Sequence, residues 1–497
     1  MLILSVCVVN KYLYKGKTTQ TGLWAVTSNQ TQQYYQENKS ARLSALIIVC
    51  IGSFLTPLAL SAALVATPEI ARDLKADAVL VSWIPAIFLL CNLITLLPSG
   101  RAADTYGRKR IYNWGSIIFL AASIGSGLST SIEMLLFFRG LQGVGAAMFY
   151  GNGFAIISSV YRSGGRGAAL GWVVSCVYLG MSAGPLFGGW VTEHFGWHYV
   201  FLAMVPFVLL AIVLTIFTLK GEWVSDTPQR LDWFGVLILA SWIISLFIGL
   251  TNLPQPLAVV SLLVSMMILY WFVRRSDQIE APLIKLRLVW ENQRFSRSLI
   301  AASFIYAGSY GVQFLIGLYL QYNLGLSPSE AGQYLLVQAI LMAFIAPIAG
   351  RLSDHYPAYL LATCGAGSVV LSFTTALFLN DHSSIWLVIL ALAFLGVGFG
   401  LFSTPNNSGA MGAVSEARQG IASALINMSR LLGQLFGTAL VTMLMSLYIG
   451  DAEIEPAYYD ELLTVLHWTV MFSLCCAVIA MFASFSMRHI KVRNEAA

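Results

Sequence analysis

From Leu43 onward the sequence is a succession of apolar runs, nearly all of which are long enough to cross a lipid bilayer. A helix needs about 20 apolar residues to cross a hydrocarbon core about 30 Å thick. The runs lie near residues 43–66, 78–99, 112–129, 133–157, 167–190, 198–219, 232–251, 256–273, 297–320, 330–350, 358–380, 384–408, 420–447 and 464–487. Only 10% of the residues are charged and 58% are hydrophobic, which excludes a soluble domain with a polar surface. The sequence therefore predicts an all-α polytopic membrane protein with fourteen transmembrane helices.

The positive charges agree with this count. Arg72 and Lys75 lie in odd-numbered loops, and Arg139 and Arg430 lie inside spans; all the other Lys and Arg residues among the 28 lie in the tails or in even-numbered loops. Because cytoplasmic loops carry an excess of Lys and Arg, this alternation predicts that both termini are cytoplasmic.

The spacing of the spans predicts six plus two plus six. We expect a disordered cytoplasmic tail at 1–42, a six-helix bundle at 43–219, two extra helices with a cytoplasmic linker at 220–296, a second six-helix bundle at 297–487, and a cytoplasmic tail at 488–497. The segment Gly350–Asp354 echoes Gly100–Asp104 at the same place in the later block, which favours repeated halves.

The connection after the second span reads GRAADTYGRKR and is expected to form a tight loop at one membrane face. Gly100 is expected to let the chain leave a closely packed helix, and Asp104 and Gly107 are turn and cap formers. The cations Arg108, Lys109 and Arg110 are expected to crowd the cytoplasmic face. The alternative is that these are ordinary basic residues of a cytoplasmic loop.

Span four contains Arg139, followed by the small residues of Gly140–Ala147. Burial of a guanidinium in a membrane costs several kcal/mol unless it is paired or lines a wet cavity, so a functional role is the default hypothesis. The alternative is an arginine whose head reaches the outer headgroups.

Span five carries Gly180, Gly184 and Gly188 at intervals of four, which predicts one groove that lets a neighbouring backbone approach. Pro185 removes a helical hydrogen bond and is expected to bend the helix, and Gly189 follows the groove. A generic helix-dimer face is the alternative.

A further set of polar residues lies inside the spans and is expected to line a cavity between the halves. Arg430 and Asn427 share one face of span thirteen near the midplane. A cavity with Arg139 and Arg430 and no buried acid should be electropositive and favour anionic or zwitterionic substrates, unless these polar groups satisfy one another across helices. The predicted cavity residues are Gln142, Asn152, Gln313, Gln338, Asn427 and Arg430.

Together these stretches resemble the major facilitator superfamily, and more narrowly its fourteen-span drug–proton antiporter branch, over residues 43–490. The resemblance implies two six-helix bundles that rock about a central site. It implies a charge-linked gate at Gly100–Arg110, proton coupling by Arg139, and an antiporter motif at Gly180–Gly189. A secondary transporter that exports small amphipathic molecules or drugs across a bacterial inner membrane is then expected. Its partners would be a small-molecule substrate, the lipid bilayer, protons and a periplasmic adaptor protein.

The sequence departs from this branch in one respect that concerns coupling. The branch carries a carboxylate within span one, where this chain has Ala59, and none of the 23 acidic residues lies in a predicted span interior. Three possibilities stay open: protons carried at the outer side by Glu133, Glu330, His198 or His467, a substrate that itself carries the charge, or a facilitator. An exporter or facilitator of one metabolite, such as a siderophore or an organic acid, is the alternative function.

Other classes find little support in the sequence. The seven cysteines lack zinc-ligand spacing, no nucleotide-binding Gly-x-x-x-x-Gly-Lys-Ser/Thr loop occurs, and the basic residues do not gather into a nucleic-acid surface. A membrane enzyme would need a cluster of His, Asp or Glu at one face. We therefore expect no metal, no cofactor, no nucleic acid and no catalysis.

Overall fold

The computed structural model describes residues 34–161, 166–224, 232–279, 282–283, 289, 292–353, 355–414, 419–450 and 452–489, and these residues form helices and connections without strands. The expected tail up to residue 33, the echo residue Asp354 and residues 490–497 lie outside this range. Thirteen helices of the described chain are long and apolar enough to cross a membrane. The fourteenth is α5, whose 20 residues begin with three cations and pack against α6 and α9. The predicted fold class is confirmed.

The first six spans are α3 (Lys39–Asp73), α4 (Ala78–Tyr106), α5 (Arg108–Gly127), α6 (Ile132–Val160), α7 (Arg166–Phe195) and the pair α8 (His198–Leu202) and α9 (Val205–Thr218). Two further spans are α10 (Trp233–Thr251) and α11 (Pro256–Gln278). The last six are α13 (Gln293–Tyr322), α14 (Pro328–Leu352), α15 (Ala358–Ala376), α16 (Ile385–Gly412), α17 (Gln419–Tyr448) and α18 (Tyr459–Ser486).

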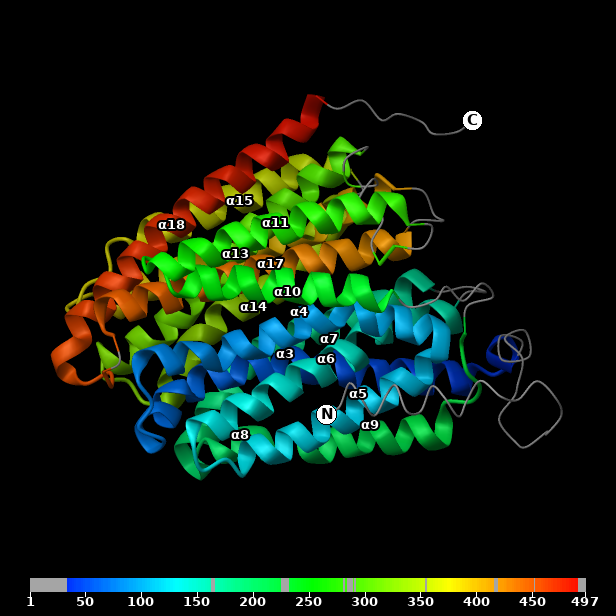
Figure 1. Ribbon diagram of the computed structural model, residues 1–497, viewed down its shortest axis with the longest axis horizontal. Coiled ribbons are helices and arrows are strands. Elements are labelled where there is room, and N and C mark those ends of the chain that lie inside the picture. The colour runs from blue at the N-terminus through cyan, green and yellow to red at the C-terminus, as the bar shows by residue number, and fades with distance from the viewer. Residues whose placement is uncertain are drawn as a thin grey trace.

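The helices α3–α9 and α13–α18 form two halves that lie side by side, with α10 and α11 beside their junction (Figure 1). The halves meet mainly where α7 packs on α14 and where α4 packs on α17, and we call this junction the seam. Helix α10 contacts both α4 and α17, so it covers one edge of the seam. The start of α3 and the end of α18 lie on one side of the molecule, which we call the tail side; the opposite one is the far side.

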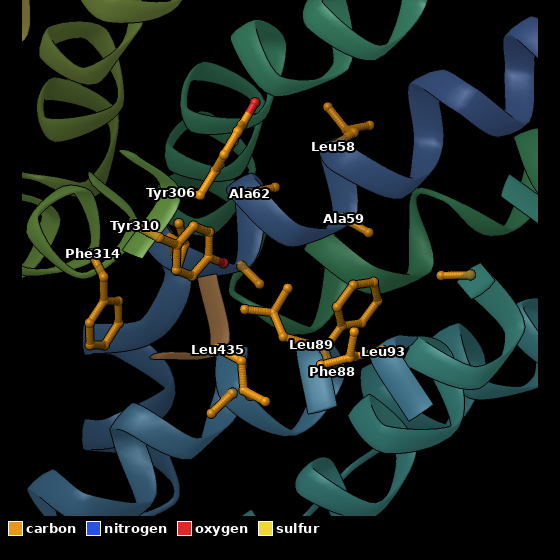
Figure 2. Packing of buried hydrophobic residues seen from close by; sticks show 14 of the residues in the cluster. Leu58, Ala59, Ala62, Phe88, Leu89, Leu93, Tyr306, Tyr310, Phe314 and Leu435 are labelled. Atoms are coloured by element: carbon orange, nitrogen blue, oxygen red, sulfur yellow. The ribbon is translucent and has the colours of Figure 1, made fainter. Parts of the chain in front are cut away.

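Apolar side chains from both halves fill the seam at mid-depth (Figure 2). Leu58 and Ala62 of α3 and Leu89 of α4 lie in one cluster with Phe314 of α13 and Leu435 of α17. Because lipid tails are as apolar as these side chains, close packing rather than the hydrophobic effect holds such helices together.

Residues 34–42, which precede the first predicted span, are ordered, so the prediction of a disordered tail is wrong for them. Asn38 caps α3 by accepting from the backbone N–H of Ala41. The ring of Tyr35 is buried against Trp223, and its hydroxyl donates to the carbonyl oxygen of Lys220 at 3.0 Å. These contacts, made to a segment 185 residues away, order the tail, and no local pattern reveals them.

Helix α3 is also longer at its far-side end than the predicted span 43–66. It continues to Asp73, so Glu69 lies within a helix rather than in a loop. The exposed Asp73 accepts a hydrogen bond of 2.9 Å from the indole N–H of the buried Trp197, which gives that N–H a partner.

Candidate functional site

Arg430 of α17 lies at the seam beside three tyrosines. Its guanidinium carbon is 4.8 Å from the centre of the Tyr306 ring on α13. It also interacts electrostatically with Tyr150 of α6 and Tyr178 of α7. Since these side chains come from both halves and Arg430 is partly exposed, they form a polar site between the halves.

The walls of this site are aromatic with hydroxyl tips. The Tyr178 hydroxyl lies 3.0 Å from that of Ser403 on α16. The ring of Tyr306 packs edge-on against Phe399 at 5.3 Å between centres. These tyrosines are not among the cavity residues that the sequence predicts. A tyrosine within an apolar span is nevertheless a signal of a polar site, because its hydroxyl needs a partner there.

Arg139 of α6 is completely buried, at 0% exposed, so its head does not reach the membrane surface. Its Nε donates to the carbonyl oxygen of Ile84 at 3.4 Å. The rings of Phe88 and Phe201 lie 4.8 and 5.7 Å from its guanidinium carbon. Aromatic faces stabilise a desolvated cation by about 2 kcal/mol.

The other predicted cavity residues do not form one surface. Gln142 accepts from Arg139 at 2.5 Å and donates to Ser123 at 2.9 Å, and it is fully buried. Asn152 donates to the carbonyl oxygen of Met148 on its own helix. The remaining members are Gln338, which is 5% exposed, and Gln313 and Asn427, which are partly exposed. In this conformation Arg139 and Gln142 pack within the first half, whereas Arg430 belongs to the partly exposed site between the halves.

The predicted loop at Gly100–Arg110 is shorter than expected. Helix α4 continues to Tyr106 and α5 begins at Arg108, so Gly107 alone connects them. Gly100 lies inside α4, and a Cβ there would meet no atom within 4 Å. The expectation that Gly100 lets the chain leave a closely packed helix is therefore wrong.

The cations at the start of α5 make different contacts. Arg108 pairs with Asp104 at 3.0 Å and donates to Ser159 on α6 at 2.6 Å. Lys109 donates to the carbonyl oxygen of Leu219, and Arg110 is exposed. The ion pair thus lies within the first half in this conformation.

Glu222, which follows α9, was not predicted and completes this loop. Its Oε1 accepts from the backbone N–H groups of Lys109 at 2.8 Å and of Trp223 at 3.3 Å. Burial raises the pKa of Glu222, although these N–H groups favour its charged form. A Cβ on Gly107 would lie 2.3 Å from the Glu222 carboxyl carbon, which explains the glycine. Glu222 therefore caps α5. The signal in the sequence that could have predicted this role is an acidic residue directly after span six.

The glycines of α7 permit close helix packing on two sides. Cβ atoms at Gly180, Gly184 and Gly188 would lie 2.2, 1.8 and 2.5 Å from atoms of α3, so the groove expected from their spacing receives α3. A Cβ at Gly189 would lie 2.2 Å from the carbonyl oxygen of Pro328 on α14. Gly189 therefore belongs to the seam.

Several hydrogen bonds cross the seam on the far side. Ser82 donates to Thr442 at 2.8 Å, and the backbone N–H of Ala78 donates to the carbonyl oxygen of Ala452 at 3.0 Å. Gln321 donates to the carbonyl oxygen of Val65 at 3.1 Å. These bonds join α3, α4, α13, α17 and the connection after α17, so the halves are closed against each other on the far side.

Two packed halves of membrane-spanning helices around a polar site are the architecture of many membrane transporters. The family model of the Major Facilitator Superfamily matches residues 49–438, and the chain belongs to this superfamily of membrane transporters.

Relatives and solved structures agree with this assignment. The chain is 30% identical over 397 residues to the riboflavin transporter RibZ of Clostridioides difficile, covering 79% of this chain and 86% of that protein. It is 27% identical over 424 residues to the multidrug resistance protein Stp of Mycobacterium tuberculosis, covering 84% and 78%. A bacterial homologue of the human lysosomal transporter Spinster, solved in an inward-facing and unoccupied conformation, has the same fold, with a TM-score of 0.65, 18% identity and coverage of 90% and 98%.

Proposed function

We propose that this protein is a secondary transporter of the fourteen-span drug–proton antiporter branch, which exports small amphipathic molecules across a bacterial inner membrane by alternating access. The observation that carries the proposal is the Arg430 site, because it is polar, partly exposed and built from both halves. A substrate held there would contact both halves and would be exposed to alternate sides as they rock.

The chemistry of the site favours anionic or zwitterionic substrates with a flat apolar body. Arg430 supplies a permanent positive charge, and Tyr306 and Phe399 supply aromatic faces. Among the described residues, Arg430 has no carboxylate within the 4.0 Å of an ion pair, so a substrate anion would meet no competing charge. The relatives that are named for riboflavin and for multidrug resistance suggest planar aromatic compounds as the first to test.

The side of the membrane that the site faces follows from the hydrogen bonds across the seam together with the distribution of Lys and Arg along the chain. If the tail side is cytoplasmic, as the distribution of Lys and Arg predicts, closure on the far side makes this the inward-facing conformation. Export then requires that the bonds between α4 and α17 and between α3 and α13 break while the tail side closes.

Proton antiport is the coupling that we propose, and uncoupled or substrate-charge-coupled transport of one metabolite is the alternative. The alternative is favoured by the surroundings of Arg139, which has no described carboxylate within ion-pair distance. Two of the carriers considered for protons already have structural partners: Glu330 closes a capping box with Ser327, and His467 lies 2.8 Å from the carbonyl oxygen of Leu379.

The test is transport in proteoliposomes with an imposed pH gradient and a panel of a cationic dye, an organic anion and riboflavin. Arg430→Gln should raise the KM for the anion by about 10- to 100-fold, as the loss of a hydrogen bond to a charged group implies. Arg274→Gln, at an exposed arginine of α11 away from the site, is the matched control and should transport as the wild type does.

Three results would each overturn a part of this proposal. Efflux of cations alone would refute the anionic preference, and an unchanged KM in Arg430→Gln would refute the site. Transport that is insensitive to the pH gradient would refute proton antiport and favour uncoupled or substrate-charge-coupled transport.

A further inference from the structure

A cavity of about 230 Å³ lies within the second half, at its tail side. It is formed where α13 and α15 begin, where α16 ends and where the short helix η3 (Met487–His489) follows α18. The polar side chains that line it are those of Arg294, Ser298, Tyr359 and Asn406. Because the Arg430 site shares none of these residues, the cavity is a separate feature of the molecule.

Asn406 of α16 brings an unpartnered acceptor to this cavity. Its side chain is 3% exposed, and its Nδ2 donates to the carbonyl oxygen of Ser298 at 3.2 Å. Since a carbonyl oxygen can only accept, this bond fixes which end of the amide is the oxygen. Among the described residues, Oδ1 of Asn406 has no hydrogen-bond partner. A ligand of this cavity should therefore carry a hydrogen-bond donor.

Arg294 brings a positive charge to the same cavity from the first turn of α13. A guanidinium only donates, and its planar fork matches the oxygens of a phosphate or a carboxylate. Helix α15 begins at this cavity with Pro357 at its N-cap, and a proline side chain has no group that can cap a helix. The positive end of the α15 dipole thus adds to the charge of Arg294, and both favour an anionic group.

Water alone fits this cavity poorly. A water molecule takes up about 30 Å³ and needs two to four polar partners, so the cavity has room for several waters. The rest of its lining, which includes Ala358, Pro405 and Met487, offers those waters few partners. An organic molecule with an anionic group, a short carbon chain and a donor matches the lining better.

We propose that this cavity binds a phosphate group whose organic substituent carries an N–H or O–H donor. The phosphate pairs with Arg294 beside the start of α15, and the donor bonds to Oδ1 of Asn406. The headgroups of phosphatidylethanolamine and phosphatidylglycerol have this chemistry, and so do the free esters phosphoethanolamine and glycerol phosphate. The ends of membrane-spanning helices lie at the level of the headgroups, so a lipid can reach the cavity. Its headgroup then joins α13 to α15 and α16.

The experiment measures thermal unfolding of the delipidated full-length protein in detergent, at constant pH and ionic strength. A ligand that binds only the folded protein raises its stability by mass action. Phosphatidylethanolamine and phosphatidylglycerol should raise the unfolding midpoint in a saturable way. Phosphatidylcholine carries the same phosphate but no donor hydrogen, so its apparent affinity should be about tenfold weaker. The two free esters form a further arm: a rise with them identifies a soluble occupant, and a rise with the lipids alone identifies the headgroup, and each supports the site.

Two variants test the two contacts separately. Arg294→Gln should weaken the apparent affinity for all these ligands by about 10- to 100-fold, as hydrogen bonds to a charged group imply. Asn406→Leu keeps the branched shape without the acceptor and should remove the preference for phosphatidylethanolamine over phosphatidylcholine. The matched control is Arg351→Gln, at an exposed arginine at the tail-side end of α14, which does not line the cavity and should leave the response unchanged.

Three results would each overturn the proposal: no rise with any lipid or ester, an equal affinity for phosphatidylethanolamine and phosphatidylcholine, or a wild-type response in Arg294→Gln. Because the readout is stability, it does not depend on which substrate the protein transports or whether it uses protons.

Discussion

The seam between the halves can be loosened by one methyl group at Gly189. A Cβ there would lie 2.2 Å from the carbonyl oxygen of Pro328, 2.9 Å from its carbonyl carbon and 3.1 Å from the Cα of Ser329. These are backbone atoms, which cannot rotate away as a side chain can. The shortest contact must lengthen by about 1 Å to reach van der Waals separation.

The cost of Gly189→Ala should appear as a change of conformation. Overpacking costs about 1–3 kcal/mol where the structure cannot yield. Here the two helices belong to different halves, so moving the halves apart relieves the clash. A cost of about 2 kcal/mol moves the equilibrium away from the far-side-closed conformation by about 30-fold.

The assay is the rate at which a thiol reagent labels a cysteine placed at Ser82, in a protein whose native cysteines are replaced by serine. Ser82 is 1% exposed and bonded to Thr442 across the seam, so labelling requires opening. Gly189→Ala should raise the rate by about 30-fold, in proportion to the open population. Gly171→Ala, on the same helix with no atom within 4 Å of its Cβ, should leave it unchanged. Equal rates for Gly189→Ala and its parent would refute the reasoning.

Three further predictions concern the charged residues near the helix ends. Glu222→Ala should lower the free energy of unfolding by about 1–2 kcal/mol, because it removes the cap of α5. Since burial raises the pKa of Glu222, the folded wild type should become more stable as the pH falls from that raised pKa toward 4.5. Thermal unfolding of Glu222→Gln should not show this pH dependence. Asp232→Asn keeps the cap of α10 but loses the bidentate bond to Arg275, which should cost about 1–2 kcal/mol at neutral pH. Because Arg275 lowers the pKa of Asp232, that difference should disappear as the pH falls below 3.8 through the lowered pKa, and a difference that persists there would contradict it. Asp104→Asn should change the unfolding free energy by less than about 1 kcal/mol, since the side chains of Arg108 and Asp104 are 26% and 41% exposed; a larger loss would show that the pair holds the fold.

The sequence by itself determined the number of spans and the grooved face of α7. A span is a local property, because about 20 apolar residues in a row have no other way to satisfy their backbone in lipid. The groove is local as well, since residues four apart share a helix face, and Gly184 accordingly lies against α3.

Only the tertiary structure decided which polar groups meet. Glu222 caps α5 by accepting from the backbone N–H of Lys109, which lies 113 residues earlier in the chain. Three tyrosines from three helices surround Arg430. Arg139 and Arg430 look alike in sequence, each an arginine within a span, but one is fully buried and the other is partly exposed. The physical reason is that helix packing in a membrane depends on the shapes of small and large side chains across distant helices. Periodicity within one helix gives the face that is buried, and it does not give the neighbour that covers it.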